Sequence, residues 1–164
     1  WSSDVCSSDL PEAAYWAALA SYTESLKGGV TAVNDMYRQV PALGRAAAQI
    51  GIRADLSNDV VLPEKNVDTI EDNRASFHEV HGLADGRVRV RVGFEWLPLG
   101  SPELLGEVRA LADELGTGIH LHLNESMTEV EDSLRRFGKR PTELAGEMGV
   151  LGDRKSTRLN SSHT

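Results

Sequence analysis

Residues 118–126 read GIHLHLNES, and this stretch decides which fold we expect for the chain. Histidines alternate with aliphatic residues in it, which is typical of a β-strand because successive side chains of a strand point to opposite faces. His120 and His122 therefore share one face, opposite the aliphatic side chains. Glu125 follows in a loop that leads into a helix. In α/β barrels the functional residues lie at strand ends and on the loops after them, so the stretch predicts one arm of a metal site.

The sequence upstream repeats this order of strand, loop and helix. Residues 87–94 (RVRVRVGF) alternate strictly and predict a strand, and Ser-Pro-Glu at 101–103 is typical of a helix start. Short apolar runs predict further strands at 30–33 and 52–56, and periodic apolar residues predict helices at 11–27, 40–50, 67–83, 101–115, 127–137 and 142–148. Strands that alternate with helices indicate parallel strands joined by helical crossovers.

The fold class expected from this alternation is α/β, in one of two forms. A closed (β/α)8 TIM barrel takes about 250 residues, and the chain has only 164. It is therefore either part of such a barrel, with about four parallel strands, or a small open sheet. Residues 29–37 (GVTAVNDMY) do not have the GxGxxG pattern, so a nucleotide-binding open sheet has no support.

The two ends of the chain have an unusual composition. Residues 1–10 (WSSDVCSSDL) and 153–164 (DRKSTRLNSSHT) are rich in Ser. The codons TGG AGT TCA GAC GTG TGC TCT TCC GAT CT encode the first segment, and their reverse complement, read one base in, encodes DRKSTRLNS. We expect both segments to be translated sequencing-adapter DNA, which leaves 11–152 as one domain. The alternative is an unrelated polar tail at each end.

Composition limits the partners that we expect. Cys6 is the only cysteine and lies in the first adapter-like segment, so neither a disulfide framework nor thiol chemistry is predicted. The net charge of -8 argues against nucleic acid or an anionic membrane as the main partner. No apolar run approaches the ~20 residues of a membrane span, and no signal peptide is visible, so a cytoplasmic protein is expected.

Five segments, in this order, resemble the middle of an enzyme of the amidohydrolase superfamily. They are GVTAVNDMY, GIRADLS, VRVGF, SPELLGEVRALADELGTGIHLHLNES and EVEDSLRRFGKRPTELAGEMGVLG. The chain is most similar to methylthioadenosine and S-adenosylhomocysteine deaminases and to related chlorohydrolases, and the most specific part is HLHLNES with EVE and FGKRP after it. This resemblance implies a partial (β/α)8 TIM barrel that runs from the second to the fifth strand unit.

The resemblance also implies roles for single residues. In this family a fifth-strand histidine three positions before a glutamate binds the catalytic metal, which makes His122 the metal ligand here. Glu125 would be the catalytic proton shuttle between the attacking water and the ring nitrogen or leaving group. His120, deeper on the same face, would support the site or pack. The expected cofactor is a divalent metal, zinc first, with iron or manganese as alternatives.

The implied reaction is hydrolytic removal of an amino group, or alternatively of a halide, from a purine-type or other heteroaromatic small molecule. Where related deaminases have a substrate-contacting histidine after the fourth strand, this chain has Glu95 and Trp96. Glu95 is a candidate acceptor for a substrate amino group, and Trp96 is a candidate stacking platform.

Part of the family's ligand set does not occur in the chain. The first-strand HxH pair, the sixth-strand histidine and the eighth-strand aspartate are missing, and a hydrolytic metal needs about three protein ligands. We therefore expect this chain by itself to be catalytically inert. Its unpaired strand edges predict self-association, and a homo-oligomeric parent is one alternative.

Each candidate also has a purely structural explanation. The two histidines could be satisfied core residues, and Glu125 could stabilise the start of the next helix. His78 and His81 lie on a mostly polar helix and are expected to be solvated. Asp35 is expected to have a turn or helix-capping role.

Overall fold

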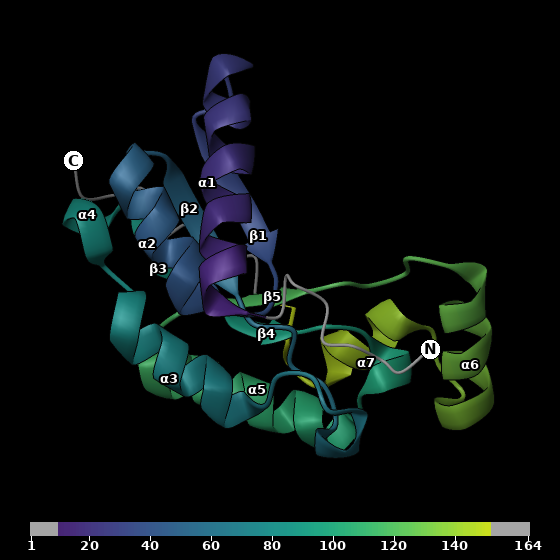
Figure 1. Cartoon of the computed structure of the whole chain (residues 1–164). Helices are drawn as coiled ribbons and strands as arrows, with labels where there is room; N and C mark the ends of the chain where they lie inside the picture. Colours follow the sequence, from purple (N-terminus) through teal and green to yellow (C-terminus); the bar gives the residue numbers. More distant parts are fainter. Residues whose placement is uncertain (1–9, 152–164) are drawn as a thin grey trace, which may run out of the picture.

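A computed structural model of the protein describes residues 10–151 (Figure 1). The adapter-like segments fall outside this range except for Leu10, so their origin and the domain borders stay predictions. The strands are β1 (Ala32–Met36), β2 (Arg53–Ser57), β3 (Val88–Val90), β4 (Val92–Phe94) and β5 (Ile119–Leu121). The α-helices are α1 (Pro11–Lys27), α2 (Val40–Ile50), α3 (Ile70–Val80), α4 (Leu83–Gly86), α5 (Pro102–Leu115), α6 (Met127–Phe137) and α7 (Pro141–Glu147). Two short 3-10 turns, η2 (Pro63–Lys65) and η3 (Leu97–Leu99), lie in the loops.

All strand pairs among the described residues are parallel, as the alternation with helices predicted. One sheet has the order β1-β2-β3 and the other pairs β4 with β5. The expected strand at 87–94 is split at Arg91, and its two halves take different partners. The N–H of Arg91 donates to the carbonyl of Leu56 at 2.8 Å, whereas the N–H of Val92 donates to that of Gly118 at 3.0 Å. The order of the strands thus follows the chain, as in a partial (β/α)8 barrel.

Asn73 on α3 holds the chain at the point where the strand changes partners. Its side chain is fully buried; Oδ1 accepts the N–H of Gly93 at 2.8 Å, and Nδ2 donates to the carbonyl of Arg91 at 3.0 Å. A Cβ at Gly93 would lie 1.8 Å from the carbonyl oxygen of Asn58, so only glycine fits there. The amide of Asn73 thereby replaces strand-to-strand hydrogen bonds that the split removes.

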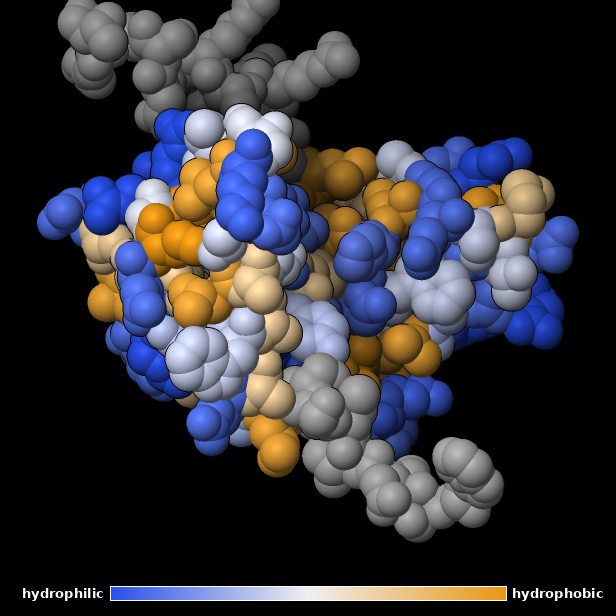
Figure 2. Space-filling model, turned by 45° about the horizontal axis from the view of Figure 1, so that its top comes forward, coloured by the Kyte–Doolittle hydropathy of each residue, from blue (hydrophilic) through white to orange (hydrophobic). Residues whose placement is uncertain are grey.

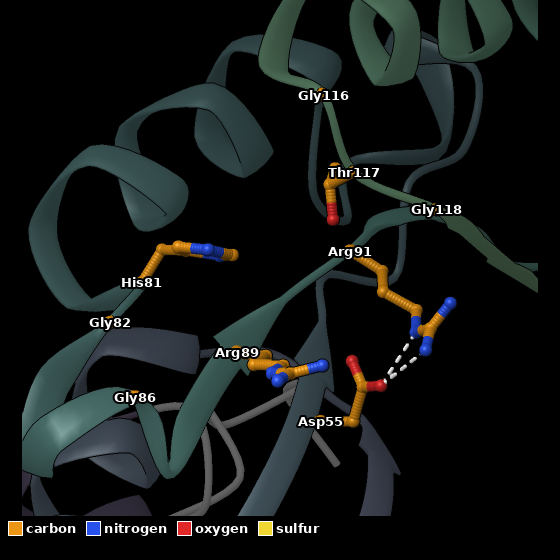
Figure 3. Close-up of a pocket in the computed structure, with 9 residues that line it drawn as sticks. All are labelled: Asp55, His81, Gly82, Gly86, Arg89, Arg91, Gly116, Thr117 and Gly118. Carbon is orange, nitrogen blue, oxygen red and sulfur yellow. Dashed lines mark hydrogen bonds and ion pairs between the residues drawn. The ribbon is translucent and has the colours of Figure 1, made fainter. Parts of the chain in front are cut away.

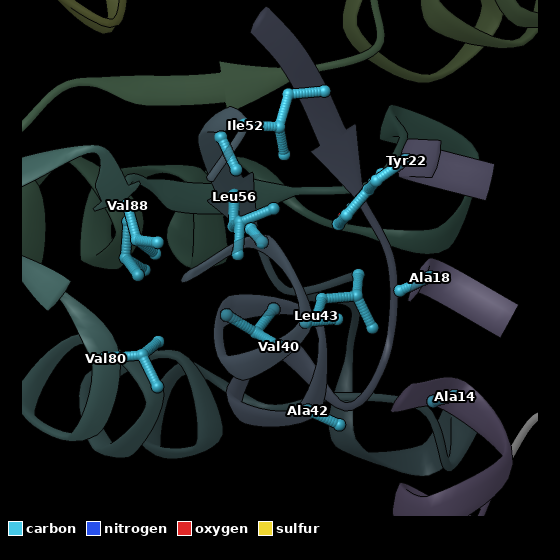
Figure 4. Packing of buried hydrophobic residues seen from close by; sticks show 14 residues of the cluster. Ala14, Ala18, Tyr22, Val40, Ala42, Leu43, Ile52, Leu56, Val80 and Val88 are labelled. Carbon is cyan, nitrogen blue, oxygen red and sulfur yellow. The ribbon is translucent and has the colours of Figure 1, made fainter. Parts of the chain in front are cut away.

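Helix α2 packs on β2 and β3, and α1 packs on α2. Figure 4 shows buried side chains of these elements gathered in one cluster. The apolar cluster between these layers includes Tyr22, Val40, Leu43, Ile52, Leu56, Val80 and Val88. Tyr22 is 2% exposed, and its hydroxyl donates to Asp35 Oδ2 at 2.7 Å. The prediction of a turn or capping role for Asp35 is wrong, because this residue lies within β1 and accepts a hydrogen bond from the core.

A second apolar cluster lies between the β4–β5 pair and the helices α5 and α7. Its members include Val92, Phe94, Leu97, Leu105, Val108, Leu111, Leu144 and Ala145. Each of the two sheets thus packs against its own apolar cluster. Helix α3 contacts both α2 and α5 and so joins the two parts. This arrangement keeps the apolar faces of the strands toward the helices and turns the polar faces inward, toward the barrel axis.

Further element boundaries also differ from the sequence-based expectation. The first strand covers Ala32–Met36 and not 30–33, because polar residues continue its pairing with β2. The helix expected at 67–83 begins only after Thr69, which caps it together with Asp72, and α4 forms a separate turn. His78 and His81 are exposed as expected, but His81 Nδ1 also accepts the N–H of Val90 at 3.1 Å.

The surface of the described part carries apolar side chains at separate places among hydrophilic ones (Figure 2). Trp16 is 59% exposed and Met127 is 70% exposed. Among the described residues β1 pairs only with β2, and β5 only with β4, so each has one open edge. No helix in the described range combines the length and the apolar character that a membrane crossing requires.

Candidate functional site

The candidate site is formed where β4 and β5 end. Gly93 pairs with His120 in the β4–β5 register, and beyond the strands the N–H of His122 donates to the carbonyl of Glu95 at 3.3 Å. His120 lies in β5 and His122 directly after its end, and the centroids of the two rings are 5.9 Å apart. Glu95 lies directly beside His122. These two residues are far apart in the sequence, and the register of the two strands brings them together.

His122 makes its contacts through one ring nitrogen. Nδ1 lies 2.9 Å from Oε2 of Glu95 and 3.1 Å from the carbonyl oxygen of the same residue. Burial opposes the charged form of the ring, but the hydrogen bond to Glu95 and its negative charge outweigh this effect, and the pKa of His122 is raised above its usual value. Glu125 contributes further negative charge. With Nδ1 facing Glu95, the second nitrogen, Nε2, is available to a ligand.

His120 points across the inner face toward β1 and β2. Its Nδ1 lies 2.9 Å from Ser57 Oγ, and its Nε2 lies 3.4 Å from the side-chain nitrogen of Asn34. Burial, together with the nearby His122, lowers the pKa of His120. The ring is therefore neutral near pH 7 and is engaged at both nitrogens, which agrees with the supporting role expected for it.

Glu125 lies in the loop between β5 and α6, and its side chain is exposed. Its backbone N–H donates to Oε2 of Glu129 at 2.7 Å, and Asn124 before it has a positive φ of 58°. Ser126 is the N-cap of α6 and accepts the N–H of Glu129 through its hydroxyl. The cap is thus made by Ser126, so the carboxylate of Glu125 is left for other contacts.

The buried Glu129 is a residue that the analysis of the sequence missed. Its side chain is fully buried, and Oε1 has no hydrogen-bond partner among the described residues. The spacing Ser126-x-x-Glu129 is that of a capping box and was the available signal. In the structure the carboxylate holds the backbone of Glu125, one residue before the cap.

Asp59, in the loop after β2, is the second residue that the sequence did not indicate. Burial raises the pKa of this carboxyl group to about 6, and the negative charges of Glu95 and Asp68 add to the effect. His122 acts in the opposite direction. Asp59 therefore adds an acidic group, beside Glu95 and Glu125, whose charge interacts with His122. The signal available in the sequence was its place on a loop that follows a strand.

Trp96 lies apart from these groups. It lines a groove of about 550 Å³ together with residues of η3 and α6, and neither Glu95, His122 nor Glu125 lines it. The indole Nε1 is buried and has no hydrogen-bond partner among the described residues. Of the two expected substrate contacts, the structure brings Glu95 to the histidines and directs Trp96 toward α6.

A pocket on the inner face of the half barrel is lined by His120 together with the charged side chains of Asp55 and Arg91. Asp55 Oδ2 accepts from Arg91 Nε at 2.7 Å and lies 2.6 Å from Nη2, and Figure 3 shows these two side chains, from β2 and from the residue between β3 and β4, facing each other. A Cβ at Gly118 would lie 2.4 Å from Arg91 Nη1, so a larger residue there would displace the flexible end of this arginine side chain. The ion pair occupies the inner face of the strands and therefore belongs to the filling of the barrel.

The donor set fits one arm of a metal site. His122 offers Nε2 from a strand end, as a ligand of a barrel enzyme does. Within residues 10–151, no group of three or more His, Cys, Asp or Glu side chains is placed to hold a metal ion. The remaining ligands of a complete site would have to come from outside the described part of the chain.

The fold and the site together define the class of protein: the chain is a piece of a (β/α)8 barrel with a histidine site at the end of its parallel strands. The sequence model of the amidohydrolase family matches residues 3–158. The chain therefore belongs to the amidohydrolase family.

Relatives with names support this assignment. A 5'-deoxyadenosine deaminase of Methanobrevibacter smithii is 38% identical over 86% of the chain, and a 5-methylthioadenosine/S-adenosylhomocysteine deaminase of Caldanaerobacter subterraneus is 34% identical over 85%. The chain covers 33% of the length of each. It thus spans about a third of these relatives.

Solved structures show the same coverage. An adenosine deaminase of Xanthomonas campestris with bound zinc matches 88% of the chain with a TM-score of 0.78 and 26% identity, and the chain covers 34% of it. An atrazine chlorohydrolase of Arthrobacter aurescens, in complex with zinc, matches 88% with a TM-score of 0.70 and 24% identity, and 37% of it is covered. The second match is evidence for the fold alone. The partial-barrel prediction is confirmed.

Proposed function

We propose that the complete protein is a metal-dependent aminohydrolase that removes an amino group from a purine-type or other heteroaromatic small molecule. The observation that carries the proposal is the arrangement at the end of β5, where His122 presents Nε2 and Glu125 follows with an exposed carboxylate. The deaminases among its relatives support the reaction class. The open site and its charges suit a small polar substrate.

In this proposal His122 is the ligand that this part of the chain contributes to a divalent metal. A metal bound there would activate a water molecule as a Lewis acid. Zinc is favoured because related structures contain it, and iron or manganese would also accept an imidazole ligand. His120 is not a ligand, since Ser57 and Asn34 occupy its nitrogens.

Glu125 would accept the proton of the attacking water and pass it to the ring nitrogen or to the departing amine. Its carboxylate is suited to this because Ser126 makes the helix cap and Glu129 holds the backbone in place. Glu95 Oε1 is left to accept from a substrate amino group, because Oε2 faces His122. Trp96 would stack on a substrate group that reaches over η3 toward α6.

The chain by itself is proposed to be inert, because it contributes one ligand of a site that needs about three. The open edges of β1 and β5 would make it self-associate. For the complete protein we propose a cytoplasmic location and no nucleic-acid or membrane partner, and a homo-oligomer remains an option. Residues 1–10 and 153–164 are proposed to derive from adapter DNA, with 11–152 as the partial domain.

A chlorohydrolase is the second candidate. The observation in its favour is Glu95, which replaces the histidine expected after the fourth strand of related deaminases. Such a departure at a substrate contact suits a different leaving group. Turnover of adenosine-type and chlorinated triazine substrates by the complete protein would separate the two candidates.

The uninterrupted reading frame, recovered from the source DNA, gives the decisive test. We expect an upstream HxH pair and a downstream histidine and aspartate at strand ends. In that complete protein, E125Q should lower kcat by about 10²- to 10⁴-fold with unchanged metal content, whereas H122N should lose metal. A frame that ends naturally near residues 11 and 152, or an E125Q variant with full activity, would contradict the proposal.

A further inference from the structure

The pair of Glu95 and His122 does more than add charge to the site. We infer that the carboxylate of Glu95 is a positioning group, which keeps the proton of His122 on Nδ1 and turns Nε2 toward the site. The value of this arrangement for metal binding rests on the proposed function. The position of the proton itself does not, and it can be measured on the chain as it is.

The contact geometry determines which ring nitrogen carries the proton. Nδ1 of His122 faces two oxygens of Glu95, Oε2 at 2.9 Å and the backbone carbonyl at 3.1 Å. A carbonyl oxygen and an ionised carboxylate accept hydrogen bonds and cannot donate them. Only an N–H at Nδ1 satisfies either contact, so the neutral ring has its lone pair on Nε2.

Backbone pairing sets the positions of the Glu95 and His122 side chains. The N–H of His122 donates to the carbonyl of Glu95 at 3.3 Å, which extends the pairing of β4 and β5 past the ends of both strands. The two side chains therefore leave neighbouring strands side by side. Because the strands themselves are packed on a buried cluster that includes Phe94, the pair is built on a rigid part of the fold.

The carboxylate adds what the carbonyl alone does not provide. A charged acceptor forms a shorter and stronger hydrogen bond than a neutral one, and it raises the basicity of the opposite ring nitrogen. The side chains of Glu95 and His122 are 31% and 44% exposed, so water screens the pair only in part. Neither Glu125 nor Asp59 makes a hydrogen bond to His122, although their charges are felt there. Glu95 is therefore the acidic side chain that orients the ring.

The test is the tautomer of His122, read from the two- and three-bond proton–nitrogen couplings of the ring in ¹⁵N-labelled chain at a pH well above the histidine titration. We expect the Nδ1–H form in the wild type. E95A should shift His122 toward the Nε2–H form, which an unconstrained imidazole prefers in water, whereas E95Q should retain Nδ1–H because its amide oxygen still accepts.

E125Q is the matched control, because it removes a neighbouring charge without removing a hydrogen bond to the ring, and it should leave the tautomer unchanged. Backbone amide spectra of each variant would show that the fold is intact. An Nε2–H form in the wild type, or the same tautomer distribution in E95A as in the wild type, would overturn the inference.

A second readout uses the complete protein and zinc alone. Loss of a hydrogen-bonding partner behind a ligand histidine weakens metal affinity by about 10- to 100-fold, so E95A should show this loss, E95Q a smaller one and E125Q none. If the tautomer responds as expected but the complete protein binds no zinc, the positioning role stands and the proposed function fails. If the complete protein binds zinc but the tautomer does not respond to E95A, the proposed function stands and the positioning role of Glu95 fails.

Discussion

Asn73 on α3 accepts the backbone N–H of Gly93 at 2.8 Å and donates to the carbonyl of Arg91 at 3.0 Å, so a helix side chain holds both sides of a strand break. The break lies between the segment that pairs with β2 and the segment that pairs with β5. One buried amide thus connects the two sheets. The position of β4, and with it that of Glu95, depends on this contact.

N73A should therefore destabilise the chain strongly. It leaves a buried N–H and a partly buried carbonyl without partners, each at a cost of about 1–3 kcal/mol, so the free energy of unfolding should fall by about 2–6 kcal/mol. Urea denaturation followed by circular dichroism measures the change. E71A on the same helix is the control, since that side chain is 71% exposed and its ion pair with Arg74 is worth about 0–1 kcal/mol. Equal midpoints for both variants would contradict the role of Asn73.

Gly93 should tolerate no side chain. A Cβ there would meet the carbonyl oxygen of Asn58 at 1.8 Å, and both backbones are buried, so G93A should cost about 3 kcal/mol or more or prevent folding. G106A on α5 is the matched control, because its Cβ would have only Met148 Cε nearby, at 3.9 Å. In a helix that exchange should stabilise by about 0.5–1 kcal/mol. Thermal unfolding of the two variants should thus give shifts of opposite sign.

Asp59 should make the stability depend on pH. Its pKa is about 6 in the folded protein against 3.8 for the unperturbed group, so the fold favours the protonated form. The stabilisation is present below about pH 4 and is lost as the pH rises through about 6. D59N removes the charge, and at pH 7.5 it should raise the free energy of unfolding by on the order of 1 kcal/mol after allowance for partial exposure.

At about pH 3 the D59N variant and the wild type should have nearly the same stability, because Asp59 is then largely protonated in both states. D113N, which removes an exposed carboxylate paired with Arg109, is a suitable comparison and should bring no gain at pH 7.5. Unfolding curves at the two pH values give all the differences. A D59N variant that gains equally at both would show that ionisation is not the cause.

Tyr22 and Asp35 should contribute as a pair. The hydroxyl of Tyr22 donates to Asp35 at 2.7 Å, and burial and the carboxylate raise the pKa of the tyrosine. Y22F removes the donor and should cost about 1.5–3 kcal/mol, as for other hydrogen bonds to charged groups. Y15F is the control, because the hydrogen bond of Tyr15 to Gln49 is exposed and its loss should change stability little. A double-mutant cycle with D35N should show coupling between the two positions.

Much of the architecture could be predicted from periodicity. The strict alternation at 118–123 predicts a strand with both histidines on one face. The structure has a shorter strand, Ile119–Leu121, with His122 just after its end and the ring of His122 5.9 Å from that of His120. The alternation of strands and helices predicts parallel pairing, which is found throughout the described residues. The start of β1 was misplaced because an apolar run is only a proxy for hydrogen bonding, and residues 34–36 pair with β2 although two of them are polar.

The split of the strand at 87–94 could not be predicted. Arginine and valine alternate across Arg91 without interruption, so no local signal marks the change of partner. The change of partner is held by Asn73, which comes from another element. Likewise, Asp59 is brought to the site by its neighbour Val60, whose carbonyl accepts the N–H of Glu95 at 3.0 Å.

The sequence by itself determined the class of fold, the face that holds His120 and His122, and the place of Glu125 on the following loop. These follow from the two-residue period of a strand and from short-range capping rules, which act within a few residues. Only the tertiary structure decided that Glu95 lies against Nδ1 of His122, that Ser57 holds His120 and that Trp96 turns toward α6. The physical reason is that strand register and helix packing bring together side chains that are distant in the chain, and no local pattern specifies which of them meet.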